Sequence, residues 1–315
     1  MNSHTELAAA LQAAPDMSGL YALLEKAGIG PGWNKPEPSL WPAPRKTFVP
    51  AHWSYEVARA ALTAAGRFVS TELAERRNLI LHNPVPGNTY GTARTIVAAY
   101  QIVKPHETAR SHRHTPNALR LVMESEPGSY TVVDGVKIPM APGDVLLTPN
   151  GSWHGHSNES DQRAIWIDFL DAPLVQLLEP MFFEPYAQGI EQTDRVDAGS
   201  PMRFAYADMM SRLDAADGPI IELGPPHLDT LTLEVWRVDP QAPIRPPRST
   251  ANSVFAVIDG SGRSQVDDAV FEWQRGDVFV APAWRPHEHS SHERSHLLRV
   301  SDERMLRKLN WWRQA

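Results

Sequence analysis

Two histidines separated by one residue, His112 and His114, constrain the fold of this chain more than any other feature. In a β-strand, side chains two positions apart point to the same face, so both imidazoles would project toward one point. Two converging imidazoles are a common way for a strand to present ligands to a divalent metal. A third ligand has to come from elsewhere. The pair therefore predicts a β structure that surrounds a metal.

A second motif downstream supplies the candidate third ligand, His154. The spacing G-x5-P-x-G-x2-H-x3-N is met at Gly143, Pro149, Gly151, His154 and Asn158. It resembles the second motif of the cupin superfamily, as the paired histidines resemble the first. The predicted metal ligands are therefore His112, His114 and His154.

Composition narrows the class of protein. Of the 315 residues, 42% are hydrophobic and 21% are charged, which is typical of a soluble globular protein. The net charge of -7 argues against a nucleic-acid partner. The absence of cysteine excludes disulfides and thiolate metal sites. Neither a signal peptide nor a membrane span is apparent, so we expect no membrane partner and a cytoplasmic location.

The helical and strand-like residue patterns along the chain predict a mainly β protein with additional helices. Leucines near helical spacing predict helix over 5–27, with a break at Pro15, and a proline-rich arm with three tryptophans follows over 31–53. Short β-rich runs split by turn residues suggest antiparallel barrels or sandwiches. The expected domains are a helical N-terminal arm (1–77), a metal-binding β domain (78–170), a helical connection (171–219) and a metal-free β domain with a terminal helix (220–315).

The two β-rich blocks are related by an offset of 133 residues. This shift superimposes several residues of the first block on identical residues of the second, namely Gly143 on Gly276, Asp144 on Asp277, Pro149 on Pro282, His154 on His287 and Asp134 on Asp267. Matches at one fixed offset indicate an internal duplication. The same shift places His112 on Arg245 and His114 on Pro247, so the second copy lacks the paired histidines. We expect metal in the first copy only.

The chain resembles the gentisate 1,2-dioxygenase family of bicupins, which includes salicylate and 1-hydroxy-2-naphthoate dioxygenases. The segments that carry the resemblance are Ala-Glu-Arg-Arg (74–77), His-Arg-His-Thr-Pro-Asn-Ala-Leu-Arg (112–120), Tyr-Thr-Val-Val-Asp-Gly (130–135), Gly-Asp-Val-Leu-Leu-Thr-Pro (143–149) and Trp-His-Gly-His (153–156). The resemblance implies two jelly-roll β-barrels and Fe(II) held by three histidines. It also implies O2-dependent cleavage of an aromatic ring between its carboxylate-bearing and ortho-hydroxyl carbons, and a homo-oligomer, either dimer or tetramer.

The chain departs from the family pattern at two positions. His106 stands where the usual first cupin motif has glycine, and Val97 stands where some members have an aromatic residue. These differences bear on the shape of the pocket. The generic cupin glutamate ligand falls on Ala118 or Leu119, which fits the three-histidine subgroup.

Arg120 is the candidate residue for holding the substrate carboxylate. It lies six residues after His114, and an even spacing on one strand would return it to the same face. A guanidinium can bind a carboxylate through two parallel hydrogen bonds. The alternative is a solvent-exposed arginine between two leucines.

Four further residues are candidates for the pocket: His156, Asp168, Gln101 and Arg76. His156 can share the face of His154, where it would support a neighbouring site residue or contact substrate, for instance as an acid or base near the hydroxyl. The alternative is a histidine that only lies on the rim. Asp168 lies within an apolar strand, so it either contacts a site or pairs with an arginine. Gln101 and Arg76 are candidates through the resemblance alone, and Arg77 is the alternative to Arg76.

The predicted function is an Fe(II)-dependent ring-cleaving dioxygenase. Its substrates would be O2 and an ortho-hydroxy aromatic carboxylate such as gentisate, salicylate, or a nitro- or halo-salicylate. Two alternatives are a metal cupin that acts as an isomerase or hydrolase, and a bicupin that only binds a small ligand.

Overall fold

The computed structural model describes residues 3–70 and 77–315, and the chain forms two compact units, Met1–Arg45 and Lys46–Ala315. The first unit contains two short helices, α1 (Ser3–Gln12) and α2 (Met17–Lys26), on either side of Pro15. Asp16 begins α2 by accepting a hydrogen bond of 2.7 Å from the backbone N–H of Gly19. The proline-rich segment that follows has no regular structure, and Trp33 is 70% exposed.

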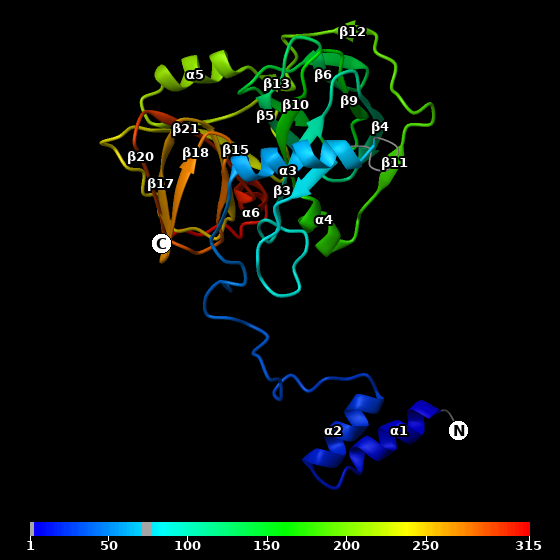
Figure 1. The fold of residues 1–315 in the computed structure, drawn as a ribbon. Coiled ribbons are helices and arrows are strands. Elements are labelled where there is room, and N and C mark those ends of the chain that lie inside the picture. Colours follow the sequence, from blue (N-terminus) through cyan, green and yellow to red (C-terminus); the bar gives the residue numbers. More distant parts are fainter. Residues whose placement is uncertain (1–2, 71–76) are drawn as a thin grey trace. The chain divides into compact units, whose positions relative to one another are not determined.

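The second unit holds two β-barrels that lie side by side (Figure 1). The elements that precede the first barrel are β1 (Ala51–Trp53) and α3 (Tyr55–Phe68). The strands of the first barrel are β2 (Arg77–Ile80), β3 (Val97–Val103), β4 (Thr108–His114), β5 (Ala118–Glu124), β6 (Ser129–Val133), β7 (Val136–Pro139), β8 (Val145–Thr148), β9 (His154–Asn158) and β10 (Ala164–Leu170).

The connecting segment and the second barrel complete the chain. The connection contains α4 (Ala172–Leu178), β11 (Phe183–Pro185), β12 (Arg195–Val196), β13 (Arg203–Phe204) and α5 (Tyr206–Asp214). The remaining elements are β14 (Ile220–Glu222), β15 (Thr232–Val238), β16 (Ser253–Asp259), β17 (Ser261–Val266), β18 (Ala269–Gln274), β19 (Val278–Ala281), β20 (His287–Ser291), β21 (Ser295–Ser301) and α6 (Glu303–Lys308). None of the helices in these described parts of the chain is long and apolar enough to cross a membrane.

Each barrel consists of two facing sheets. In the first barrel the sheets have the strand orders β13-β8-β5-β10-β3-β2 and β11-β4-β9-β6-β7-β12. In the second they have the orders β1-β19-β16-β21-β15-β14 and β18-β17-β20. Two facing sheets of mainly antiparallel strands form the jelly-roll architecture that the resemblance implies.

The sheet containing β3, β5 and β10 is buried on both faces. On β10, Ile165 and Ile167 belong to a large hydrophobic core that also contains buried residues of the second barrel, such as Val254 and Leu298. The alternate residue Trp166 points to the other face and belongs to a core inside the first barrel. Strict alternation therefore separates the core between the barrels from the interior of the first barrel.

The backbone confirms the internal duplication. Strands β8 and β19, and likewise β9 and β20, begin and end at positions that differ by 133 residues. Asp134 and Asp267 both adopt a positive φ, 47° and 49°, which is uncommon for a non-glycine residue. A shared strained turn at the same offset shows that the two barrels repeat one backbone plan.

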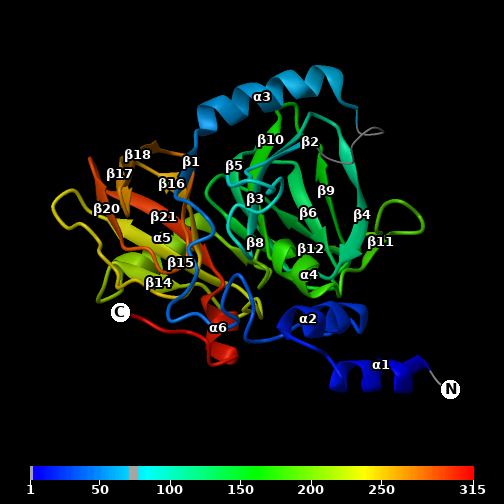
Figure 2. The same ribbon diagram turned by 90° about the horizontal axis from the view of Figure 1, so that it is seen from below.

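The segments before each barrel dock on the opposite barrel. Strand β1 precedes the first barrel but pairs with β19 of the second, and the N–H of Tyr55 donates to Asp277 at 2.8 Å. Strand β13 precedes the second barrel but pairs with β8 of the first, and the N–H of Tyr206 donates to Asp144 at 2.9 Å. From its start on the second barrel, α3 runs across the first (Figure 2). These reciprocal crossings join the barrels into one body.

The expectation of a helical connection over 171–219 is correct only in part. Besides α4 and α5, this segment contributes three short strands to the first barrel, and β11 pairs with β4. Helical spacing of leucines at Leu174, Leu177 and Leu178 marks α4, but the strands are only two or three residues long. Such short strands carry too few residues for periodicity to reveal them.

Candidate metal centre

His112, His114 and His154 converge at one point on the inner face of the first barrel. His112 and His114 lie on β4, two residues apart, and His154 begins the neighbouring antiparallel strand β9. The register sets His154 directly opposite His112. One ligand nitrogen from each ring lies within 4.8 Å of the other two. Among residues 3–70 and 77–315 this is the only such group of three or more potential metal ligands.

Backbone carbonyls orient the three imidazole rings. Nδ1 of His112 lies 3.3 Å from the carbonyl oxygen of Arg110, and Nδ1 of His114 lies 2.8 Å from that of Pro116. Nδ1 of His154 lies 3.0 Å from the carbonyl oxygen of Ser152. Because a carbonyl only accepts, each Nδ1 carries the hydrogen and each Nε2 keeps its lone pair. This is the arrangement that a neutral imidazole needs to bind a metal through Nε2.

The donor set fits a divalent metal. Two imidazole nitrogens each about 2.1 Å from one cation lie at most about 4.2 Å apart, so small ring rotations would bring all three into contact with it. Three neutral ligands leave the net charge of the cation uncompensated. The site therefore favours an anionic group in the remaining coordination positions.

The three histidines open on a cavity of about 160 Å³ inside the barrel. Its polar lining comes from strands of both sheets and from loops, and its apolar lining comes mainly from β3, β5 and β10. The lining residues are Asn78, Ile80, Tyr90, Val97, Ala99, Gln101, His112, His114, Ala118, Arg120, His154, Asp168, Leu170 and Phe183.

Three predicted pocket residues, Gln101, Arg120 and Asp168, meet in this cavity. They lie on the adjacent strands β3, β5 and β10, where the register places Asp168 opposite Arg120. The Gln101 amide donates to Oδ2 of Asp168, and Nε of Arg120 lies 3.6 Å from Oδ1 of Asp168. All three side chains are buried.

Two acceptors in this group have no hydrogen-bond donor among the described residues: Oε1 of Gln101 and Oδ1 of Asp168. A buried acceptor left without a donor costs about 1–3 kcal/mol. Both residues line the cavity, so a ligand that carries an N–H or O–H group can supply the donor.

Arg120 faces the cavity, but not because of its even spacing from His114. Strand β4 ends at His114 and β5 begins at Ala118, so the two residues do not share one continuous strand. Alternation within β5 decides the direction instead, because Leu119 and Leu121 pack into the core between the barrels. The alternative of a solvent-exposed arginine is wrong, since Arg120 is 1% exposed.

His156 lies beside Arg120 but does not line the cavity. Nη1 of Arg120 is 2.5 Å from Nδ1 and 2.9 Å from Nε2 of His156, and Nη2 donates to the hydroxyl of Thr148 at 3.1 Å. Nδ1 of His156 is also 2.8 Å from the hydroxyl oxygen of Thr131. The structure therefore places His156 behind the guanidinium rather than on the rim of the pocket.

Arg76 lies outside the residues that the structure describes. Its alternative, Arg77, does not line the cavity, because its guanidinium bonds both carboxylate oxygens of Glu107, at 2.7 and 2.9 Å, and the carbonyl oxygen of Val69. Of the two departures from the family pattern, Val97 lines the cavity, whereas His106 lies at the surface and contacts Asp161.

Several residues of the cavity wall were not predicted from the sequence, among them Asn78, Tyr90 and Phe183. Asn78 lies on the short strand β2, Tyr90 in the loop that follows it, and Phe183 on β11. The ring of Phe183 lies 5.1 Å from that of His112, although the two residues are far apart in the sequence. No local pattern distinguishes these residues, because only strand pairing brings them to the metal site.

Among the described residues, the second barrel has no comparable group of potential metal ligands. Its interior is filled by Trp236, Phe255 and Phe279, whose rings surround His289 at 4.6 to 5.6 Å. Arg245, at the position equivalent to His112, lies outside any strand and pairs with Glu288 at the surface. None of the strands described for this barrel corresponds to β4, and aromatic rings fill its interior.

Comparisons with known proteins agree with this architecture. A cupin domain family model matches residues 99–170 and 234–300. The chain is 31% identical over 331 residues to gentisate 1,2-dioxygenase 1 of Aquipseudomonas alcaligenes, covering 94% of this chain and 95% of the relative. It is 32% identical over 336 residues to 5-aminosalicylate 1,2-dioxygenase of Comamonas sp, covering 95% and 90%.

Solved structures give the same result. Salicylate 1,2-dioxygenase of Pseudoaminobacter salicylatoxidans, in an adduct with gentisate, superimposes with a TM-score of 0.86 at 27% sequence identity. The match covers 96% of this chain and 94% of that one. The resemblance therefore extends over both barrels and is not confined to a single cupin motif.

Proposed function

The chain belongs to the ring-cleaving bicupin dioxygenases that include gentisate and salicylate 1,2-dioxygenases, and from this premise we propose that Fe(II) and an ortho-hydroxy aromatic carboxylate are its metal and substrate. O2 would be inserted between the carboxylate-bearing and hydroxyl-bearing ring carbons. The relatives reported above are all named as dioxygenases, which sets aside the isomerase, hydrolase and ligand-binding alternatives.

The observation that best supports the proposal is the shared cavity of the three histidines and Arg120. His112, His114 and His154 would hold the metal through Nε2. When bound, Fe(II) would supply the Lewis-acid and redox chemistry that O2 requires. An anionic chelating substrate complements a site whose protein ligands are all neutral.

Arg120 would orient the substrate through its carboxylate. Its guanidinium lines the cavity and is held from behind by Thr131, Thr148 and His156. A buried cation that is fixed in this way attracts a carboxylate without a large loss of side-chain entropy on binding. His156 would act as a positioning residue for Arg120 and not as a group that contacts the ring.

Gln101 and Asp168 would select the ring substituents. Their acceptors, Oε1 and Oδ1, would receive a hydrogen bond from a donor on the ring. Gentisate carries a second hydroxyl group and 5-aminosalicylate carries an amino group, whereas salicylate has no further donor. We therefore expect a preference for rings with such a donor, since a polar site rejects analogues that leave its groups unpaired.

The assembly would be a homo-oligomer, either a dimer or a tetramer, in the cytoplasm. The first unit supports this view, because α2 has no buried residue and Trp33 and Trp41 are exposed. Short helices without a buried face gain little stability alone, so a second copy would cover them. Light scattering at micromolar concentration measures the mass, and a monomer would contradict the proposal.

Oxygen uptake by protein that has been anaerobically reconstituted with Fe(II) tests the reaction. The substrates are gentisate, 5-aminosalicylate, salicylate and 1-hydroxy-2-naphthoate, and phenol and benzoate serve as controls that lack one member of the chelating pair. Uptake should require both the carboxylate and the hydroxyl group. If none of the four complete substrates causes oxygen uptake, the proposed substrate class is refuted.

A further inference from the structure

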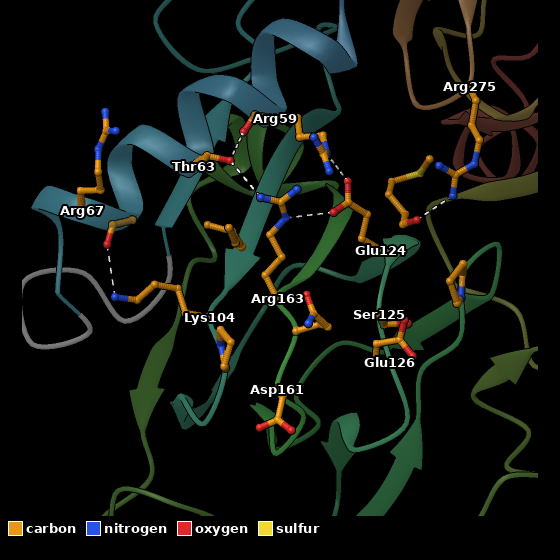
Figure 3. Close-up of a pocket in the computed structure, with 16 residues that line it drawn as sticks. Arg59, Thr63, Arg67, Lys104, Glu124, Ser125, Glu126, Asp161, Arg163 and Arg275 are labelled. Carbon is orange, nitrogen blue, oxygen red and sulfur yellow. Dashed lines mark hydrogen bonds and ion pairs between the residues drawn. The ribbon is translucent and has the colours of Figure 1, made fainter.

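A second and much larger cleft lies at the opposite ends of the strands that carry the pocket residues. Its volume is about 780 Å³, and it shares no lining residue with the metal cavity. Lys104 directly follows β3, Glu124 ends β5 and Arg163 directly precedes β10. Helix α3 forms the opposite wall of the cleft (Figure 3).

Positive side chains dominate the lining of this cleft. Five cationic residues line it, namely Arg59, Arg67, Lys104, Arg163 and Arg275, against three carboxylates, Glu124, Glu126 and Asp161. Both Arg59 and Arg163 contact Glu124, so that one carboxylate balances only one of the two charges. Positive charge in a concave surface concentrates anions from solution.

Arg275 adds charge that the contacts do not neutralise. It comes from the second barrel, and its Nη2 donates to the backbone carbonyl oxygen of Met123 at 2.6 Å. A carbonyl holds the guanidinium in place but does not cancel its charge. Figure 3 shows Arg59 and Arg163 reaching toward Glu124, while Arg275 enters from the other barrel. The cations therefore come from three separate parts of the fold.

The cleft also has an apolar lining. Pro105 and Pro142 line it and are exposed, whereas Ile102 and Met123, which also line it, are almost fully buried. Pockets for small molecules have volumes of about 300–1,000 Å³ and combine apolar walls with a few polar groups. The size and lining of the cleft meet both conditions.

We infer that this cleft is a second binding site, separate from the metal cavity, for a small organic anion with a carboxylate on an apolar body. The cations at the cleft attract the carboxylate, and the exposed rings of Pro105 and Pro142 contact the apolar part. Glu126 opposes binding, because its carboxylate is exposed and makes no hydrogen bond or ion pair within the described residues.

Calorimetric titration of the Fe(II)-loaded protein with benzoate under nitrogen tests this inference. Arg275→Gln should weaken one class of benzoate site by about threefold or more, as expected for one surface charge. Arg294→Gln is the matched control, because Arg294 is an exposed arginine of the same barrel that pairs with Asp239 away from the cleft. It should leave benzoate binding unchanged.

A second variant changes affinity in the opposite direction. Glu126→Gln should tighten the same site by about threefold, which a folding defect does not explain. Benzamide, the neutral analogue, should not bind there. The cleft site should persist in Arg120→Ala, whose change is confined to the metal cavity, so failure of the proposed function and failure of this inference are distinguishable.

Two results would overturn the inference. One is benzoate binding that is identical in the Arg275→Gln and Arg294→Gln variants. The other is displacement of benzoate by an equal concentration of inorganic phosphate, which would show that charge alone attracts anions to this surface.

Discussion

Nη1 of Arg120 lies 2.5 Å from Nδ1 of His156, and the same nitrogen lies 3.1 Å from the hydroxyl oxygen of Thr131. A guanidinium has no acceptor, so the imidazole accepts in this contact. His156 thus supports the charged group of Arg120 from the side away from the cavity. Two residues that the sequence suggested as separate pocket groups act as one structural unit.

Replacing Arg120 by Ala should lower kcat/KM for salicylate by at least about tenfold, since a hydrogen bond to a charged group contributes about 1.5–3 kcal/mol. Steady-state oxygen uptake measures the loss, and metal analysis should show full metal content because Arg120 is not a ligand. Arg120→Lys should recover only part of the activity, since an ammonium cannot reproduce the planar fork. Equal weakening of salicylate and phenol binding would show that Arg120 does not contact the carboxylate.

His112→Ala should remove the metal, whereas His287→Ala should leave one metal per chain. His112 belongs to the three-histidine cluster, while the equivalent second-barrel cluster is absent from the described residues. Elemental analysis after reconstitution and desalting measures the content. Two metals per chain in the unmodified protein, or metal loss in His287→Ala, would mean that the site is misassigned.

Asp168→Asn should reduce the preference for gentisate over salicylate. Oδ1 of Asp168 is buried and lacks a hydrogen-bond donor among the described residues, and an amide accepts more weakly than a carboxylate. We expect the ratio of kcat/KM values to change by about tenfold, corresponding to roughly 1.4 kcal/mol. Any effect of the substitution on carboxylate binding by Arg120 cancels in this ratio, because both substrates carry the same carboxylate. An unchanged ratio would exclude Asp168 from recognition of the ring substituent.

His287 should make the second barrel less stable at mildly acidic pH. Burial, together with a smaller contribution from the charge of Arg299, lowers the pKa of His287 from 6.5 to about 3. Below about pH 6.5 the unfolded chain binds a proton that the folded chain does not, so the free energy of unfolding falls with falling pH by up to about 1.4 kcal/mol per unit. Above that pH the contribution is constant.

Urea unfolding between pH 7.5 and 5 measures this dependence. His287→Gln should flatten it, although the buried His289, whose pKa is also lowered, keeps part of it. His292→Gln replaces an exposed histidine of the same barrel and is the control. A slope in His287→Gln equal to that of the control would contradict the assignment.

Gly143→Ala and Gly276→Ala should destabilise the protein more than Gly151→Ala. All three glycines have positive φ, at 86°, 88° and 74°. A methyl group at Gly143 would lie 2.7 Å from the ring of Tyr206, and one at Gly276 would lie 2.5 Å from that of Tyr55, whereas Gly151 has open space. Conformational strain alone costs about 1–2 kcal/mol, and overpacking adds about 1–3 kcal/mol at the first two positions.

Thermal unfolding of the three variants in parallel tests this ranking. The first two changes act where the N-termini of α5 and α3 cross to the opposite barrel. Equal losses in all three variants would show that the close approach of the tyrosine rings contributes nothing.

The three-histidine cluster was predictable in part, because the arrangement of two of its members is local. Alternation along one strand directs His112 and His114 to the same face, and it depends only on adjacent residues. The duplication was also visible, because Asp134 and Gly143 recur at one offset as Asp267 and Gly276, and all four adopt a positive φ. The second motif added His154 by resemblance, and its register opposite His112 completed the site.

The sequence predicted the pocket residues less well, because strand register and side-chain packing determine which residues line the pocket. Leu119 and Leu121 indicated which way Arg120 points, but the even spacing from His114 was the wrong reason, since a turn separates the two strands. His156 alternates correctly with His154, yet contacts with Arg120 and Thr131 place it outside the cavity lining.

The sequence by itself determined the two β-rich blocks, their duplication and the placing of His112 and His114 on one face. Each of these rests on periodicity or spacing along the chain, whereas the jelly-roll barrels and His154 came from resemblance. Only the tertiary structure decided that Phe183 lines the cavity beside the histidines. It also decided that Tyr55 bonds Asp277 of the second barrel and that Tyr206 bonds Asp144 of the first. Those contacts join residues far apart in the chain, and their free energy exists only when both barrels are packed together.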